Sequence, residues 1–469
     1  MDIFLAGRFV KTNKGLNVIN PYNGNIAGRT FWAGIEELEE AIQAALAARR
    51  PMQSLSSYQR YEILMHIKTR LQQRHSEFAD LIMQESGKPI RYASGEVDRS
   101  VQTITVAAEE SKRTPREYIS LDWTKAGERK EGLVRYFPVG VVAGIAPFNF
   151  PLNLAVHKLA PAIAAGCPVI LKPSSSTPLS MLLLAEIIAE TNLPAGAVSV
   201  LPMDRETGNL LVTDERIALL SFTGSPEVGW KMKAAAGKKK VVLELGGNAG
   251  VVITPSADIE SALTKCLSGA FSYSGQVCIH TQRIFVHKDI FNVFASRFAE
   301  MTSQLISGEP ASLQTDVSCM IDEANAQRVE KWVNDAKAEG ARVLAGGKRT
   351  GTFYAPTILT NTNHSMQVCS DEIFGPVVTL EPYEDFDEAI ALLNNTRFGL
   401  QAGIFTNNMD EMNRAFESIV AGGIIMNDVP TFRVDHMPYG GVKDSGIGRE
   451  GVKYAMLDML EPRILVKSF

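Results

Sequence analysis

Between residues 139 and 253 the chain alternates short β-branched runs with helical segments, and this alternation constrains the fold more than any other feature. The helix-like segments 179–191 and 206–212 lie between the runs, which read VVAGIAP, PVILKPS, VSVLP, IALLSFTGS and KVVLELGG. Strands that alternate with helices form βαβ units around a parallel sheet. A second series follows, in which helical patterns at 258–270 and 324–338 accompany the runs RIFVHKD and GGIIMN. We therefore expect an α/β protein with two Rossmann-like parallel-sheet domains in tandem.

The rest of the chain fits around this framework. Its 469 residues exceed the ~250–300 at which one core stops growing. The first 30 residues have the turn signals of short strands, and helical patterns follow at 35–49, 58–74 and 93–111. The polar stretch 122–131 interrupts the pattern and predicts a hairpin or a linker.

Charge and cysteine content exclude several classes of function. A net charge of −5 creates no field that attracts nucleic acid or an anionic membrane, so we expect neither as a partner. The five cysteines include no CxxC pair, which favours a reducing compartment. The charged N-terminus does not resemble a secretion signal, and the apolar run 139–148 is too short to span a membrane. We expect a cytoplasmic protein without a metal site.

Cys278 is the first candidate for chemistry. It follows Gly275 and Gln276 in a polar turn between a helical pattern and the strand RIFVH. A loop cysteine can meet a substrate, and nearby backbone N–H groups can stabilise its thiolate. The alternative is a small buried side chain without reactivity, which is common for free cysteines.

Two further side chains suit acid–base and electrostatic roles. Glu244 ends an apolar strand before two glycines, where burial would raise its pKa toward that of a general base. It is alternatively an acid satisfied by the backbone N–H groups of the glycine turn. Asn149 lies between Pro147 and Pro151, and a rigid amide there can donate to an oxyanion. An asparagine in a turn is alternatively a local turn former.

Two strand ends are candidates for binding a cofactor. Lys172 ends a buried strand at the edge where parallel sheets bind ligands, although it is alternatively a solvated lysine at the start of a loop. Ser225 is expected to cap a helix that begins at Pro226, and a helix N-terminus favours a pyrophosphate. No GxGxxG occurs, so the ordinary dinucleotide fingerprint is absent.

Taken together, these segments resemble the aldehyde dehydrogenase superfamily. The segments that carry the resemblance occur in one order from Phe148 to Gly451 and read FNFP, LKPSS, FTGSPEVG, LELGG, GQVC, EIFGP and GGVKDSGIGREG. INPYNG near the start extends the resemblance over essentially the whole chain.

The resemblance implies a role for each matching residue. Cys278 matches the nucleophile, Asn149 the oxyanion-hole amide and Glu244 the base that activates water for hydrolysis of a thioester. Hydride would pass to a nicotinamide. The positions that match cofactor contacts are Pro147, Phe148, Lys172, Ser174, Ser175, Phe222, Thr223, Gly224, Ser225, Leu245, Gly246, Glu372 and Phe374.

The resemblance leaves cofactor choice between NAD and NADP. In the family, the lysine that matches Lys172 contacts the adenosine ribose. NAD-preferring members often carry a glutamate three residues after this lysine, where its charge repels a 2′-phosphate. Ser175 stands there in this chain, which favours NADP or the use of both cofactors.

Residues 430–456, which read PTFRVDHMPYGGVKDSGIGREGVKYAM, resemble one branch of this family. That branch handles small polar or anionic aldehydes and includes lactaldehyde, non-phosphorylating glyceraldehyde-phosphate, succinate-semialdehyde and phosphonoacetaldehyde dehydrogenases. Arg433 would pair with a substrate carboxylate or phosphonate, or is instead a surface or interface arginine. His157 is a second candidate, for which we favour a buried histidine bonded to backbone. Further candidates for the substrate pocket are Arg99, Phe150, Ile279 and His280.

The same resemblance predicts a division of the chain. Residues 1–118 and 139–246 would bind the cofactor, and 247–445 would carry the nucleophile. A hairpin at 119–138 and a C-terminal strand within 446–469 would join subunits into a homodimer or homotetramer.

Three alternatives remain. A relative that passes the thioester to coenzyme A would generally lack Glu244. A non-enzymatic structural relative would have lost catalytic positions, but Asn149, Glu244 and Cys278 are all present. An unrelated cysteine hydrolase would need a histidine and an asparagine that meet the cysteine only in space.

Overall fold

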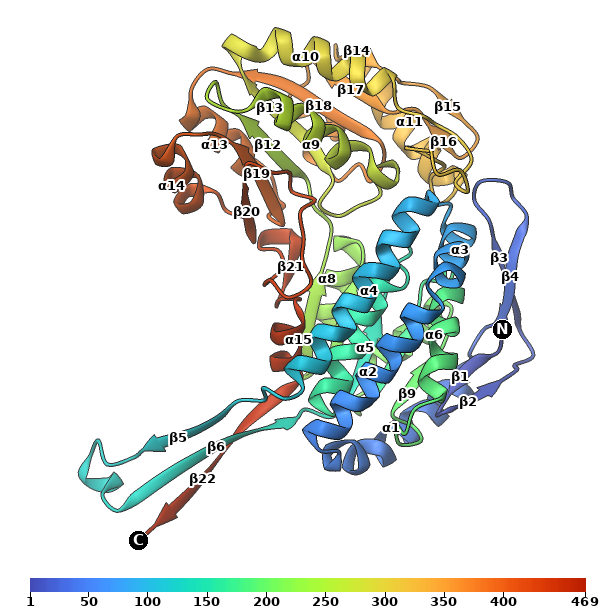
Figure 1. Cartoon of the computed structure of the whole chain (residues 1–469), viewed down its shortest axis with the longest axis vertical. Helices are drawn as coiled ribbons and strands as arrows, with labels where there is room; N and C mark the ends of the chain where they lie inside the picture. The colour runs from blue at the N-terminus through green and yellow to red at the C-terminus, as the bar shows by residue number, and fades with distance from the viewer.

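The computed structural model describes residues 1–469 and has two twisted sheets as its framework, each with helices on both faces (Figure 1). The first sheet holds eight strands in the spatial order β2 (Arg8–Val10), β1 (Ile3–Leu5), β9 (Val198–Val200), β8 (Val169–Lys172), β7 (Val141–Ile145), β10 (Ile217–Thr223), β11 (Lys240–Glu244) and β21 (Gly446–Ile447). The five strands from β9 to β11 are parallel, and the flanking strands are antiparallel.

Both faces of this sheet are buried, which explains why its strands are continuous apolar runs. Val142 of β7 packs in a core with one group of helices, whereas its neighbours Val141 and Ala143 belong to the core on the opposite face. The helices on the first face are α2 (Ser57–Gln73), α3 (His75–Ser86), α4 (Ile90–Glu110), α5 (Asn153–Ala165), α6 (Leu179–Ala189) and α15 (Val452–Asp458). Those on the second face are α1 (Ile35–Ser54), α7 (Arg205–Thr213) and α8 (Pro226–Ala235).

The second sheet is parallel except for one edge strand. Its seven strands have the order β14 (Arg342–Ala345), β17 (Thr357–Thr360), β18 (Val377–Tyr383), β13 (Thr281–His287), β12 (Ala249–Ile253), β19 (Gln401–Phe405) and β20 (Gly423–Met426). Helices α9 (Ile259–Phe271) and α10 (Lys288–Ser303) pack on one face. The other cores of this unit contain α11 (Glu323–Ala338), α12 (Gln367–Ser370), α13 (Phe386–Asn394) and α14 (Met409–Ser418).

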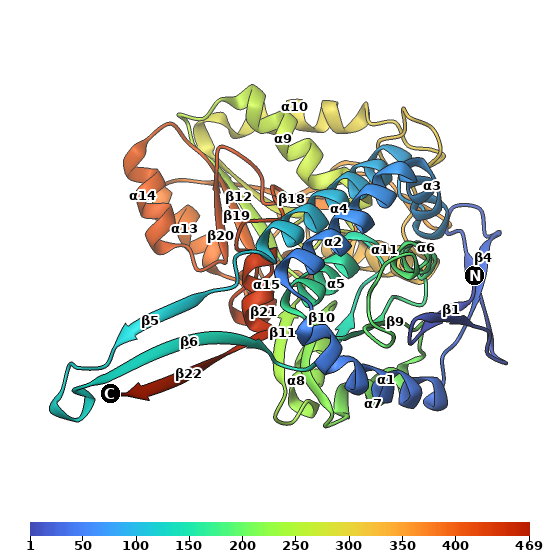
Figure 2. The same cartoon turned by 60° about the horizontal axis from the view of Figure 1, so that its bottom comes forward.

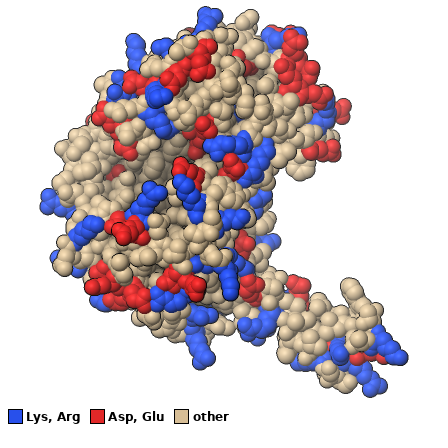
Figure 3. Space-filling view, turned by 180° about the vertical axis from the view of Figure 1, so that it is seen from behind, with Lys and Arg blue, Asp and Glu red and all other residues tan.

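A third sheet forms an arm that projects from the body (Figures 1 and 2). It has the order β22 (Leu460–Ser468), β6 (Lys130–Pro138), β5 (Arg116–Ser120), and both pairings are antiparallel. The stretch that we predicted as a hairpin or a linker is the turn between β5 and β6, so it belongs to a hairpin. Seen from behind, the arm is mostly uncharged with charged side chains toward its tip, and the body shows basic and acidic groups interspersed (Figure 3).

Smaller elements complete the chain. They are the two-stranded sheets β3 (Gly15–Ile19) with β4 (Ile26–Phe31) and β15 (Arg349–Thr350) with β16 (Phe353–Tyr354), and the 3-10 turns η1 (Lys125–Gly127), η2 (Ser272–Gly275) and η3 (Lys443–Ser445). None of the helices has both the length and the apolar character needed to cross a bilayer. The α/β class with two parallel sheets and an additional small β element, predicted from the sequence, is confirmed.

Candidate active site

The candidate site lies where the strand order of the first sheet changes direction. The chain runs from β7 to β8 and β9 on one side, and then returns to place β10 and β11 on the other side of β7. Loops at the carboxyl ends of strands on both sides of such a switch point leave a crevice between them. Asn149 follows β7, Gly224 and Ser225 follow β10, and Glu244 ends β11.

A cleft of about 790 Å³ opens at this position, and all three predicted catalytic residues line it. Asn149 and Cys278 lie in loops and Glu244 ends β11. Asn149 and Glu244 are 95 residues apart in the sequence, and Glu244 and Cys278 are 34 apart. The predicted cofactor residues that also line the cleft are Pro147, Phe148, Thr223, Gly224, Ser225, Leu245, Gly246, Glu372 and Phe374. The sequence analysis missed other lining residues, among them Trp230, Arg328, Trp332 and Arg397.

Cys278 follows a strained turn. Tyr273 and Ser274 have positive φ angles of 49° and 53°, which residues other than glycine rarely adopt. Gly275, at φ 67°, has no room for a larger residue, because a Cβ would lie 2.1 Å from the carbonyl oxygen of Gly375. The Cys278 sulfur is 3.1 Å from the hydroxyl of Tyr439. Burial raises the pKa of the Cys278 thiol to about 11.

Asn149 is held firmly beside the nucleophile loop. Its side-chain Nδ2 donates to the carbonyl of Gln276 at 3.0 Å, and its Oδ1 accepts from the Phe150 backbone N–H at 3.2 Å. A carboxamide nitrogen carries two N–H bonds, so one of them remains for a substrate oxygen. The turn-forming and the oxyanion-binding interpretations are therefore compatible in one side chain.

Glu244 is buried at 3% exposure, and neither carboxyl oxygen has a hydrogen-bond partner. The alternative in which the glycine turn satisfies this acid is therefore wrong. Burial raises the pKa of Glu244 well above its usual range, and the nearby Glu450 carboxylate adds to the rise. Arg433 and Lys158 oppose it. An unpaired buried carboxyl of this kind can take up a proton from water.

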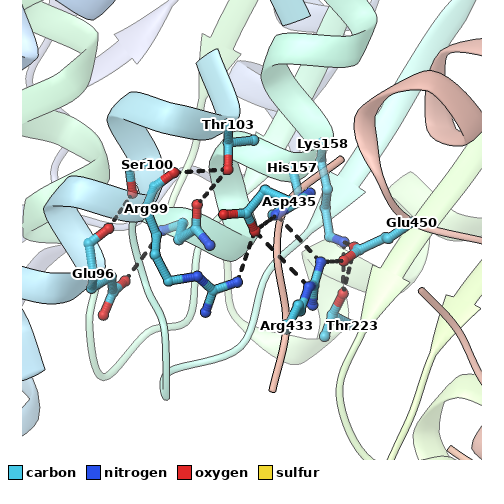
Figure 4. A network of polar contacts seen from close by, with 11 residues as sticks. Glu96, Arg99, Ser100, Thr103, His157, Lys158, Thr223, Arg433, Asp435 and Glu450 are labelled. Carbon is cyan, nitrogen blue, oxygen red and sulfur yellow. Dashed lines mark hydrogen bonds and ion pairs between the residues drawn. The ribbon is translucent and has the colours of Figure 1, made fainter. Parts of the chain in front are cut away.

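The charged groups that shift the pKa of Glu244 belong to a buried ionic network (Figure 4). Lys158 donates to Thr223 at 2.7 Å and to Glu450 at 3.2 Å, and Arg433 donates to the other Glu450 oxygen at 2.9 Å. Although burial alone would raise the pKa of Glu450, Lys158, His157 and Arg433 hold it at about 2. Glu450 therefore stays ionised beside Glu244, whose raised pKa makes its carboxylate a stronger base.

The structure corrects two expectations about this network. Arg433 is not a surface arginine, because its side chain is only 6% exposed and pairs with Glu450. His157 is buried on α5 as expected, but its Nε2 lies 2.9 Å from Asp435 and its bond is therefore to a carboxylate rather than to backbone. Arg99 donates to the same Asp435 oxygen at 2.7 Å and is 32% exposed, so it borders the network on the solvent side (Figure 4).

A second cavity of about 750 Å³ lies along the carboxyl ends of β8 and β10. Lys172, Ser175 and Phe222 line it, as does Arg205 at the start of α7, which the sequence analysis missed. Burial lowers the pKa of Lys172, and its stem packs so close to Gly208 that a Cβ there would approach the Lys172 side chain to 3.0 Å. The donors in this cavity fit a ribose with or without a 2′-phosphate.

Helix α8 contributes residues to both cavities, and the start of this helix fits a pyrophosphate. Helix α8 begins at Pro226, with its free N–H groups at the cleft. Ser225 takes the capping position, but its side chain makes no capping bond, contrary to the expectation. Glu372 accepts from the Gly247 N–H at 3.1 Å, and burial raises its pKa to about 7. A Cβ on Gly246 would lie 2.1 Å from the Glu372 carboxyl, so a larger residue at position 246 would displace Glu372.

The remaining predicted residues lie outside both cavity linings. Phe150 packs edge-on against Tyr273 at 6.2 Å, and Ile279 is buried. His280 is buried with neither ring nitrogen partnered, and burial lowers its pKa to about 4. Ser174 accepts a bond from the backbone of Ser176.

Comparisons with known proteins agree with this geometry. Residues 9–465 match the aldehyde dehydrogenase family. The chain is 43% identical over 465 residues to 3-sulfolactaldehyde dehydrogenase of Priestia aryabhattai, covering 99% of this chain and 97% of the relative.

Solved structures are similar over the same extent. Aldehyde dehydrogenase 21 from Physcomitrella patens, in complex with its reaction product succinate, superposes with a TM-score of 0.98 at 45% identity, covering 100% and 98% of the two chains. GapN from Methanocaldococcus jannaschii, complexed with NADP, gives a TM-score of 0.94 at 38% identity, covering 98% and 100%. The chain belongs to the aldehyde dehydrogenase family, whose members oxidise aldehydes through a cysteine with the help of a nicotinamide cofactor.

Proposed function

We propose that this chain oxidises a small aldehyde with an anionic group, such as a carboxylate or a sulfonate, to its carboxylic acid. The observation that carries the proposal is the convergence of Cys278, Asn149 and Glu244 on one cleft next to a buried ionic network. A thiol, an amide donor and an unpaired acid are the groups that acyl transfer through a thioester requires.

Each residue then has a defined task. The Cys278 thiolate attacks the aldehyde carbon, and the free N–H of Asn149 stabilises the oxyanion of the resulting thiohemiacetal. A nicotinamide cofactor held in the cleft would supply the hydride acceptor, and loss of the hydride from this adduct would leave a thioester on Cys278. Glu244 removes a proton from water, the hydroxide attacks the thioester carbon, and the thiolate departs with the acid released.

The cofactor proposal is that NADP serves at least as well as NAD. Lys172 and Arg205 supply two cations around the predicted ribose position, and Ser175 adds a hydroxyl where a carboxylate would repel a 2′-phosphate. The NADP held by GapN, the relative described above, agrees with this choice.

The anionic substrate proposal rests on Arg99. Its guanidinium is 32% exposed, lies 5.8 Å from the Phe150 ring and uses one nitrogen for Asp435. A guanidinium has further N–H donors in a planar fork that suits a carboxylate or a sulfonate. The relatives named for sulfolactaldehyde and found with succinate act on or release anions of this kind.

The unit around the first sheet, predicted as 1–118 and 139–246, is proposed to bind the cofactor, and 247–445 to supply the nucleophile. The arm, predicted as the hairpin 119–138 and a C-terminal strand within 446–469, is proposed to pair with a second copy in a homodimer or homotetramer. Strand β22 leaves Ile464 and Leu465 about half exposed along a free sheet edge, which favours such pairing. Five cysteines without a disulfide agree with a place in the cytoplasm.

A panel of aldehydes tests the proposal. Succinate semialdehyde, sulfolactaldehyde, lactaldehyde and propanal are each offered with NAD and with NADP, and reduced cofactor is followed by absorbance. We expect the two anionic aldehydes to give the highest kcat/KM, with NADP at least equal to NAD. A preference for propanal would contradict the anionic class, and strict use of NAD would contradict the cofactor assignment.

A further inference from the structure

Tyr439 contacts the sulfur that the proposed function makes the nucleophile. Its phenolic oxygen lies 3.1 Å from the Cys278 sulfur, and it is the side-chain partner of that sulfur. Tyr439 is 3% exposed, and its ring packs in a small cluster with Ile279 and Leu400. The sequence analysis assigned it no role.

The backbone and the ring of Tyr439 are each restrained by neighbours. The backbone of Tyr439 pairs with that of Glu450 through bonds of 2.9 and 2.6 Å. The guanidinium of Arg433 lies 3.7 Å from the centre of the Tyr439 ring, and Glu450 holds Arg433 in turn. The next residue, Gly440, passes so close to Glu244 that a Cβ would lie 2.8 Å from its carboxyl. The phenol therefore has little freedom to leave the sulfur.

The direction of the hydrogen bond follows from the chemistry of the pair. A thiolate carries no proton, so it accepts and the phenol donates. Burial raises the pKa of Tyr439 well above its usual range, which keeps the phenol protonated as a donor, while Arg433 acts to lower it. A cation over the ring thus makes the hydroxyl a stronger donor without removing its proton.

The surroundings of Cys278 create the need for such a donor. Burial raises the pKa of the thiol, and the carboxyls of Glu372 and Glu244 raise it further. Tyr439 and Arg433 are the groups that lower it. Tyr439 does so through its hydrogen bond and Arg433 through its charge, and the guanidinium of Arg433 also lies over the Tyr439 ring.

We propose that Tyr439 is a catalytic residue that donates its hydroxyl hydrogen bond to the Cys278 thiolate, and that Arg433 strengthens this donor by lying on its ring. When the thiol ionises, the S–H bond breaks and its proton leaves to water in the cleft. Tyr439 keeps its own proton throughout. The inference rests on the proposed role of Cys278 as nucleophile.

The test compares Tyr439→Phe with Tyr383→Phe, which removes another buried hydroxyl, bonded to the Ile253 carbonyl in the second sheet. The cofactor-free enzyme is alkylated with iodoacetamide at a fixed pH below the thiol pKa, and modification of Cys278 is followed by mass spectrometry. Loss of a bond to a charged group raises the thiol pKa by about one unit, which reduces the thiolate about tenfold. Because a more basic thiolate is also more nucleophilic, we expect alkylation to slow about three- to fourfold in Tyr439→Phe and not in Tyr383→Phe.

An unchanged alkylation rate in Tyr439→Phe overturns the inference. If that variant does not fold, a fluorinated tyrosine incorporated at position 439 replaces it. The more acidic phenol must then increase the thiolate absorbance at a given pH, and an unchanged absorbance also overturns the inference. Cys278→Ser separates the two proposals, because turnover by this variant would refute the proposed function whatever the thiol measurements show.

Discussion

Replacing Asn149 with alanine tests the proposed oxyanion site most directly. The carboxamide donates one N–H to the Gln276 carbonyl at 3.0 Å, which leaves one N–H to face a substrate oxygen bound at Cys278. The substitution removes that single donor. Loss of one oxyanion-hole donor costs about 2.7–4 kcal/mol of transition-state stabilisation, so kcat should fall by roughly two to three orders of magnitude.

The assay is the initial rate of cofactor reduction with the best aldehyde of the panel, analysed for kcat and KM separately. The variant also loses the bond to Gln276, which lies two residues before Cys278. Alkylation of Cys278 by iodoacetamide therefore serves as a check that the nucleophile loop has kept its shape.

Asn153→Ala provides the matched control. Asn153 is buried at the start of α5, four residues after Asn149, and bonds to Thr103 at 3.0 Å, but it does not line the cleft. We expect this control to cost stability and little turnover. Near-normal kcat in Asn149→Ala, with Cys278 alkylated at the usual rate, would refute the oxyanion role.

Four further outcomes are expected. Glu244→Gln should reduce about one cofactor per site in a burst and then turn over slowly, because an amide cannot take the proton of the hydrolytic water; stopped-flow absorbance checks this. Ser175→Glu should lower kcat/KM for NADP relative to NAD at least tenfold, since like charges about 4 Å apart near a surface repel by up to about 4 kcal/mol. Arg99→Gln should raise KM for succinate semialdehyde and leave that for propanal nearly unchanged in the aldehyde panel. Burial raises the pKa of Glu372 to about 7. The protonated side chain therefore contributes stability that is complete below its usual pKa and is lost as pH rises through 7. Over this pH window, Tm measured without cofactor should fall less in Glu372→Gln than in the parent.

Much of the fold could be predicted because its strands are buried on both faces. Strand β7 is apolar at every position, and such runs separated by helical segments specify a parallel sheet. Helix α3 was missed, because Arg74 both ends α2 and begins α3 without a glycine or proline between them. The helix predicted at 35–49 continues to Ser54 through Pro51, a residue that usually ends a helix.

The proposed site likewise has a part that the sequence could predict and a part that it could not. Asn149 and Glu244 each follow a strand of one parallel sheet, so topology alone places them at the same edge. The pairings that surround them have no local signal, because Lys158 and Glu450 are 292 residues apart and Cys278 and Tyr439 are 161 apart. A polar aromatic residue next to two glycines in MPYGG is the one feature that could have indicated Tyr439.

The contacts of the buried network bear on whether Arg433 or Arg99 can bind a substrate anion. An anion that took Arg433 from Glu450 would leave this buried carboxylate with Lys158 as its one paired cation, and breaking a buried pair costs about 3–5 kcal/mol. Arg99 faces no such cost, because it is partly exposed and can accept a second anion while it keeps Asp435. Asp435 also bonds to His157. An anion bound to Arg99 would therefore share this arginine with the carboxylate that holds His157 in the network. We therefore propose that Arg99 selects the substrate, and that Arg433 acts on the Tyr439 ring rather than on the substrate.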